Sequence, residues 1–138
     1  MNYIMELDSK DVEDFDFIVI EGFANDIQDE NYKKSVFENE LSNSLKHLNS
    51  IKKEEAIVMV VTTPPLPNTK KYKEYIDTQK EVWAVAMRQA NNNNAFYCST
   101  SNVNAHYAIN TADHPTYQGH SNMAYVVAQC MKEALKKN

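Results

Sequence analysis

The sequence predicts an α/β protein in which a parallel sheet lies between layers of helices. Short apolar runs rich in β-branched residues alternate along the chain with longer segments whose apolar residues recur at helical spacing. The predicted order is β-α-β-α-β-α. Such alternation, with right-handed crossovers, is typical of parallel sheets covered by helices. With 138 residues, the chain fits a single domain, 1–138, with one substantial core.

The first strand and the first helix are predicted in the amino-terminal third of the chain. Residues 15–20 form an aromatic and β-branched run, which indicates a buried strand. Between residues 31 and 53, apolar side chains recur at the spacing of an amphipathic helix. Asp29 or Asn31 could cap the start of this helix.

A second strand and a second helix follow. Residues 56–62 are continuously apolar up to a threonine, as in strands covered on both faces, and two prolines follow shortly afterwards. Residues 72–90 again keep helical spacing, and the asparagine run at 91–94 is expected to end that helix.

The last strand and the last helix each contain one cysteine. Residues 95–100 predict a third strand, and residues 121–136 predict a helix with lysines in its last turns, where they favour the helix dipole. Cys98 and Cys130 have no metal-ligand spacing, so we expect both to be buried free thiols.

Composition excludes several classes of partner. The net charge is −5 and the lysines are scattered, which argues against a nucleic-acid or anionic-membrane partner. No apolar run approaches the ~20 residues that span a bilayer. The acidic start of the chain does not resemble a signal peptide. We therefore expect a soluble protein without a membrane span.

The turn before the last helix is the first candidate for chemistry. The sequence DHPT at residues 113–116 places His114 before a proline, which pushes the histidine out of the helical region. Loops held in this way often carry catalytic groups, although an ordinary turn is the alternative. The predicted strands lead into residues 21–26, 62–68 and, through a loop, this turn. Ligands bind at that edge of a parallel sheet, which favours a functional site.

Residues 21–26 (EGFAND) and 113–116 (DHPT) together resemble the third and fifth sequence blocks of the SGNH (GDSL-like) ester hydrolases. The resemblance covers nearly the whole chain. It implies a flavodoxin-like three-layer α/β/α sandwich that hydrolyses an ester or acetyl group, such as one on a carbohydrate, through a serine acyl-enzyme without a cofactor or metal. By position, His114 would be the general base, and Asn25 would donate its amide to the oxyanion hole. Asp26 would hold the turn.

The sequence departs from the family pattern at two site positions. The family acid stands three residues before the histidine, where this chain has Thr111. Asp113 is the only nearby carboxylate and is the candidate triad acid. Because adjacent side chains of an extended segment point apart, a dyad whose imidazole is held by a backbone carbonyl is the alternative. Phe23 occupies the place of the family glycine two residues before Asn25.

The nucleophile block of the family is missing. No serine lies in a glycine-bearing turn, and Ser99 and Ser101 are the remaining internal candidates. The chain resembles the carboxy-terminal part of an SGNH hydrolase, so the isolated chain is predicted to be inactive. An upstream segment or a second polypeptide could supply the serine. The alternative is a non-catalytic module that binds carbohydrate or a protein partner.

The sequence also gives expectations for several other side chains. His106 could contact substrate at the edge of the site. His120 is expected to be a surface or capping residue, since its spacing from His114 does not suit a metal. His47 is expected to be solvated and Trp83 to lie in the core. Residues 64–68 could line a substrate pocket or stiffen a crossover.

Overall fold

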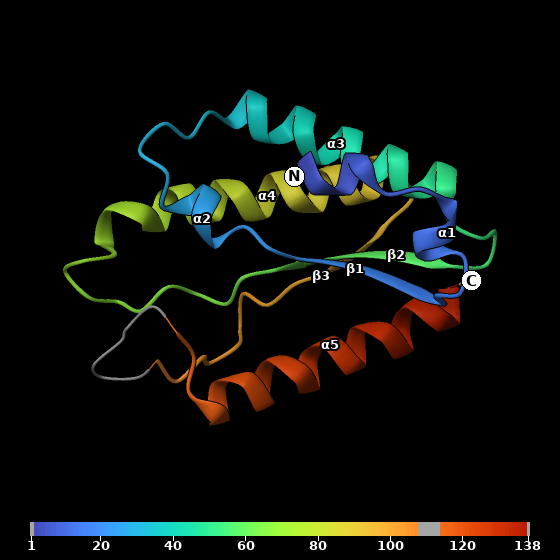
Figure 1. The fold of residues 1–138 in the computed structure, drawn as a ribbon. Helices are drawn as coiled ribbons and strands as arrows, with labels where there is room; N and C mark the ends of the chain where they lie inside the picture. Colours follow the sequence, from blue (N-terminus) through green and yellow to red (C-terminus); the bar gives the residue numbers. More distant parts are fainter. Residues whose placement is uncertain (1, 108–113, 138) are drawn as a thin grey trace.

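The computed structural model describes residues 2–107 and 114–137 and confirms the α/β class (Figure 1). One parallel sheet contains β1 (Phe17–Gly22), β2 (Ile57–Thr62) and β3 (Phe96–Cys98), with β2 in the centre. Val19 of β1 pairs with Met59 of β2. Because the strands are parallel, their carboxyl ends meet at one edge of the sheet.

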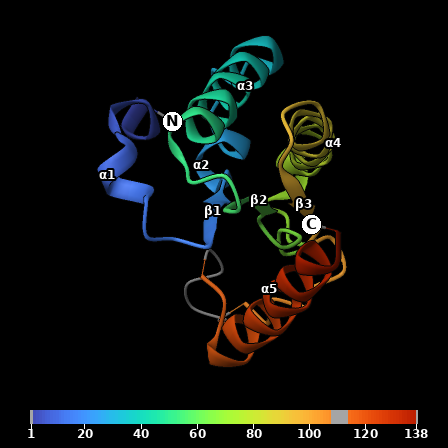
Figure 2. The same cartoon turned by 90° about the vertical axis from the view of Figure 1, so that its right-hand side faces the viewer.

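Helices cover both faces of the sheet. Helix α3 (Lys34–Ile51) and helix α4 (Ile76–Asn92) lie on one face, and α5 (Tyr117–Lys137) lies on the other (Figures 1 and 2). Two right-handed crossovers that advance in the same direction place their helices on the same face, as observed. The predicted order of strands and long helices is confirmed. Among the helices of the described residues, none is long and apolar enough to cross a membrane.

The short helical segments were not predicted. They are η1 (Asn2–Glu6), α1 (Ser9–Val12), α2 (Ala24–Ile27) and η2 (Lys73–Tyr75). Each spans at most five residues, which is too short for hydrophobic periodicity to mark it.

The sheet separates two groups of core residues. Side chains of a strand alternate between its faces. Val58 and Val60 of β2 therefore pack with α3 and α4, whereas Met59 and Val61 pack toward α5 with Cys98. All six residues of β2 are buried, which confirms the prediction of a strand covered on both faces.

Strand β1 is covered on one face only, so the prediction of a buried strand holds for that face and was wrong for the other. Ile18 and Ile20 pack on the α3 side of the sheet. Val19 points to the other face and is 41% exposed. Apolar composition alone could not reveal this difference, because it does not show whether a neighbouring helix covers the second face.

The expectation of two free thiols was also wrong, because Cys98 and Cys130 form a disulfide. Cys98 is fully buried at the end of β3, and Cys130 lies on the side of α5 that packs against the sheet. Their Cα atoms are 5.7 Å apart, within the range that a disulfide spans. The bond fastens α5 to the sheet.

The start of α3 and the environment of His47 differ from expectation. The residue before α3 is Lys33, and no side chain caps the helix. Asp29 instead accepts a hydrogen bond from the backbone N–H of Asn31 within the preceding turn. His47 is half-buried, and its Nε2 donates to the carbonyl of Leu7 at 2.8 Å. This histidine therefore holds the amino-terminal segment against α3 rather than being solvated.

Candidate functional site

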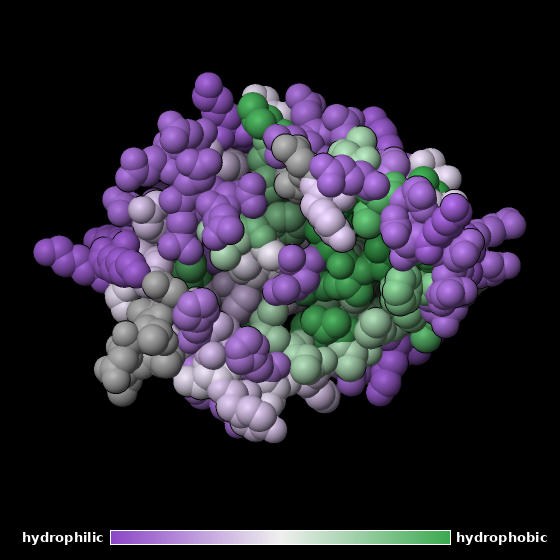
Figure 3. All heavy atoms as spheres, in the orientation of Figure 1, coloured by the Kyte–Doolittle hydropathy of each residue, from purple (hydrophilic) through white to green (hydrophobic). Residues whose placement is uncertain are grey.

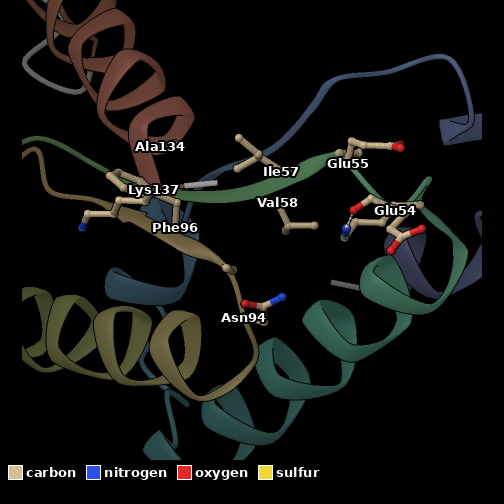
Figure 4. Close-up of a pocket in the computed structure, with 11 residues that line it drawn as sticks. Glu54, Glu55, Ile57, Val58, Asn94, Phe96, Ala134 and Lys137 are labelled. Atoms are coloured by element: carbon tan, nitrogen blue, oxygen red, sulfur yellow. Dashed lines mark hydrogen bonds between the residues drawn. The ribbon is translucent and has the colours of Figure 1, made fainter.

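Two large hollows lie at opposite edges of the sheet. The hollow at the amino edge has a volume of about 620 Å³ and is lined largely by charged and small residues (Figure 4). Its two lysines contact their neighbours: Lys52 Nζ donates to the carbonyl of Glu54 at 3.0 Å, and Lys137 Nζ lies 5.1 Å from the ring centre of Phe96. Among the described residues, no histidine, serine or cysteine lines it. Ligands of parallel sheets bind at the other edge.

The hollow at the carboxyl edge is the candidate site. Its volume is about 570 Å³, and most of its lining is apolar. It lies where α5 diverges from the sheet toward the amino-terminal end of the helix (Figure 1). Gly22 and Ala24 line it from one motif segment, and Pro115 and His120 line it from the other region. The prediction that both motifs meet at one edge of the sheet is confirmed.

The turn from β1 into α2 has an unusual backbone. Gly22 has φ +143°, and Phe23 has φ +77°, in the left-handed region. That region favours glycine, because a Cβ there crowds the following carbonyl oxygen. Phe23 nevertheless buries its ring, which meets the ring of Phe37 edge-on at 5.4 Å. The turn therefore has a glycine-type backbone at the position where the ester-hydrolase pattern has glycine.

Asn25 and Asp26 follow this turn in α2. Asn25 is exposed, directly after the pocket-lining Ala24, and its side chain makes no hydrogen bond within the described part of the chain. Burial raises the pKa of the Asp26 carboxyl above its ordinary value, and a hydrogen bond from its own backbone N–H partly offsets that rise. This self-contact agrees with the expected role of Asp26 in holding the turn.

The turn at the start of α5 is fixed by backbone contacts. Pro115 forms an antiparallel bridge with Tyr107, and the N–H of Thr116 donates to the carbonyl of His106 at 3.0 Å. The Tyr107 hydroxyl donates to the carbonyl of Pro65 at 3.0 Å. The turn is thereby fastened to the loop after β2, which also reaches the pocket.

The histidine and acid candidates of this region differ in whether they reach the pocket. His114 is exposed and stands beside the pocket-lining Pro115. Asp113 and Thr111 lie outside the described residues. His106 is exposed and does not line the pocket. His120 lies in the first turn of α5 and does line it, a role that the sequence interpretation missed because the helix begins at Tyr117 rather than at residue 121.

The internal serine candidates are not joined to a histidine. The Ser99 and Ser101 hydroxyls lie 3.0 Å from each other at the end of β3. Within residues 2–107 and 114–137, no serine hydroxyl forms a hydrogen bond with a histidine ring. Neither serine lines the pocket.

Buried polar side chains shape the loop after β2. Gln79 of α4 accepts a hydrogen bond from the N–H of Leu66 and donates to the carbonyl of Pro64 at 3.0 Å. Trp83 Nε1 donates to the carbonyl of Thr63, and the Thr100 hydroxyl lies 2.7 Å from the same oxygen. Trp83 is half-buried and belongs to neither group of core residues, so the expectation that it lies in the core was wrong; its indole N–H holds this loop instead.

Residues 64–68 contribute to the pocket, because Pro64 and Leu66 line it. Sequence reasoning missed Gln79 and Thr100 as positioning residues. The available signal was a polar residue on the core-facing side of a predicted helix, because buried polar groups normally have a hydrogen-bond partner.

Gly119 brings α5 close to the loop that ends at Tyr107. A Cβ at Gly119 would overlap the carbonyl group of Ala105 and would lie 2.9 Å from Cβ of Pro115. Nearby, the Asn122 amide donates to the carbonyl of Asn104 at 2.8 Å. The pocket wall therefore depends on a close approach that only glycine permits.

Replacing Gly119 by alanine should destabilise the protein by about 1–3 kcal/mol, the cost of overpacking. In an ordinary helix interior the same change stabilises by about 1 kcal/mol. The sign of the change in the free energy of unfolding therefore shows whether Gly119 is closely packed. Urea denaturation checks it, with Ser121→Ala at an exposed position of the same helix as the control. A gain in stability for Gly119→Ala would contradict the close approach.

No protein-family model matches the sequence, and no curated protein matches it.

Proposed function

We propose that this chain provides the histidine and the acyl-binding pocket of an SGNH-type ester hydrolase site. The observation that supports the proposal is the shared pocket: residues of the EGFAND segment and of the segment that follows His114 line one hollow at the carboxyl edge of a parallel sheet. Two segments from opposite ends of the sequence are brought together at the edge where ligands of such sheets bind.

The lining suits the acyl part of an ester. Leu66, Met123 and Val127 make it apolar, and its volume of about 570 Å³ is in the range of small-molecule sites. Two polar groups lie beneath this surface. The hydroxyls of Thr63 and Tyr72 are buried and have no hydrogen-bond partner among the described residues. A polar ligand atom that reached either hydroxyl would remove an unfavourable unpaired group.

The proposed chemistry needs three functions around the ester carbonyl. A hydroxyl oxygen attacks the carbonyl carbon while His114 takes its proton, and the proton passes to the leaving alkoxide when the carbon–oxygen bond breaks. Asn25 donates its amide to the oxyanion that forms between these steps. Asp113 or a backbone carbonyl orients the imidazole. The attacking serine comes from another polypeptide segment.

An added alcohol can stand in for the missing serine. In the presence of methanol, p-nitrophenyl butyrate should be converted to methyl butyrate and p-nitrophenol, with His114 accepting the methanol proton. We expect the methanol-dependent rate to fall at least tenfold in His114→Ala, since a general base contributes roughly 10²–10⁴ to a rate. Without alcohol, the chain should release no p-nitrophenol in a burst.

His47→Ala is the control, because His47 lies on α3, in the helix layer on the other side of the sheet from α5 (Figure 2), and does not line the pocket. It should leave the methanol-dependent rate unchanged. Equal rates for the parent chain and His114→Ala would contradict the general-base role. A burst without alcohol would show that the chain contains its own nucleophile.

A non-catalytic binding module is the second candidate function. It is favoured by the absence, within the described residues, of any hydrogen bond between a serine and a histidine. Saturable binding of an ester together with a methanol-dependent rate that is insensitive to His114→Ala would support this function instead.

A further inference from the structure

The strongest unassigned feature is an uncovered apolar surface beside β1, which shares its α5 side with the candidate pocket. We call it the β1 surface and define it by Phe17 and Val19 of β1 and by Val127, Ala128 and Met131 of α5. Figure 3 shows hydrophobic atoms gathered in this region, between α5 and the helices of the opposite layer. We infer that the β1 surface binds a strand–helix segment of a second polypeptide, whose strand pairs in parallel with β1 and whose helix lies beside α5.

The first observation is the uncovered face of the strand. Ile18 and Ile20 pack against the α3 side, so Phe17 and Val19 point toward the α5 side. The core on that side contains Met59, with other residues of β2, β3 and α5, but none of β1. Val19 is consequently 41% exposed at the centre of its strand.

The second observation is the open edge of the same strand. Within the described residues, β1 pairs with β2 and with no other strand. Its outer backbone N–H and carbonyl groups are therefore available to a further strand. Such an edge, when apolar, is a template for pairing with another chain.

The third observation is the partly exposed flank of α5, in which Val127 and Met131 are half-buried. In this 21-residue helix, only Gly119 and Ala134 are buried. Val127, Ala128 and Met131 line the hollow together with Glu21 and Gly22 of β1, so this flank faces the open strand. Ala128 is small and exposed, which allows a second helix to approach closely.

One occupant covers both the open edge and the uncovered face. A strand alone would pair with the edge but would leave Val19 exposed on its α5 side. A strand followed by a helix on that side completes both the hydrogen-bonding edge and the helix layer. A right-handed crossover that leads away from β1, opposite to the direction of α3 and α4, places its helix on the α5 face.

Charge argues against a second copy of this chain as the occupant. Glu13, Asp14 and Asp16 precede β1 and are exposed, and Glu21 is exposed near its end. Asp16 is paired with Lys53 at 2.7 Å, whereas no ion pair involves Glu13 or Asp14 within the described residues. Antiparallel pairing of two β1 strands would bring Glu21 of one copy near this acidic segment of the other, and like charges across a strand pair are destabilising. A parallel partner strand that begins with lysine or arginine would instead face the acidic residues before β1.

A designed peptide tests this inference without reference to ester hydrolysis. The probe begins with two lysines, continues with a valine-rich strand of about 6 residues, and ends with an amphipathic helix of about 12 residues, the usual element lengths. We expect saturable binding by fluorescence anisotropy. Val19→Asp should weaken binding at least tenfold, because it places a carboxylate in the apolar surface.

Val36→Asp is the matched control, because Val36 is 49% exposed on α3 and lies outside the β1 surface. It should leave the affinity unchanged, and circular dichroism should show that both variants fold. The strand peptide alone, the helix peptide alone and the probe with both lysines replaced by glutamate should each bind at least tenfold more weakly than the probe.

Three results would overturn the inference. They are an absence of saturable binding, equal loss of affinity in Val19→Asp and Val36→Asp, and a dimer by light scattering that Val19→Asp abolishes. The last result would assign the surface to a second copy of the chain. Val19 does not line the pocket, so Val19→Asp should leave the methanol-dependent rate unchanged. A failure of this inference can therefore be distinguished from a failure of the proposed ester hydrolase site.

Discussion

Replacing Phe23 by alanine should lower the free energy of unfolding by about 3–5 kcal/mol, the usual cost of removing a buried phenylalanine ring. The ring is 8% exposed and packs edge-on against Phe37. Replacement by glycine removes the same ring but also relieves the left-handed backbone, where φ is +77°. Phe23→Gly should therefore be about 1 kcal/mol more stable than Phe23→Ala.

The matched control is Phe37, which is also buried, at 3% exposed, but lies within α3. In a helix, glycine is about 1 kcal/mol less favourable than alanine, so Phe37→Gly should be less stable than Phe37→Ala. Chemical denaturation of the four variants shows whether alanine or glycine is the more stable replacement at each of the two positions. If glycine were the less stable choice at position 23 as well, the left-handed turn at the candidate site would be contradicted.

Removing the disulfide should cost roughly 3–4 kcal/mol. Cys98 and Cys130 are 32 residues apart, and closing a loop of that length reduces the entropy of the unfolded chain by about this amount in the chain-entropy model. Cys98→Ala combined with Cys130→Ala should show the loss in guanidinium denaturation. The effect should be large, because only Gly119 and Ala134 of α5 are fully buried, and the bond adds to the partly buried contacts of Val126, Val127 and Met131 with the sheet.

A reducing agent provides the control for this experiment. Dithiothreitol should lower the denaturation midpoint of the parent chain and leave that of the double variant unchanged. If dithiothreitol left the parent midpoint unchanged while both cysteines were reduced, the bond would not contribute to stability.

The sequence predicted the elements that have a strong local pattern. The apolar run of β2 and the helical spacing of α3 and α4 identified these elements within a few residues of their observed ends. The start of α5 was placed four residues late, because residues 117–120 are polar or small and carry no apolar pattern. That error hid the position of His120 on the pocket wall.

Properties that depend on distant parts of the chain were not predictable in the same way. The exposure of Val19 depends on whether a helix covers it, and the disulfide depends on where α5 crosses the sheet. The convergence of Gly22 and Pro115 at one pocket could be predicted, because parallel strands align their carboxyl ends. The contacts of Gln79 with the loop after β2 could not, because they involve backbone groups whose positions only the fold defines.

The most direct test of the central claim is to locate the binding of an uncleavable ester mimic by NMR. In a titration with 2-heptanone, the amide signals of Gly22, Ala24 and Val127 at the carboxyl edge should shift together and saturate. Signals of Ala56 and Phe96, which line the amino-edge hollow, should not move. Saturable shifts confined to the amino edge, or no saturable shifts at either edge, would contradict an acyl-binding site at the carboxyl edge of the sheet.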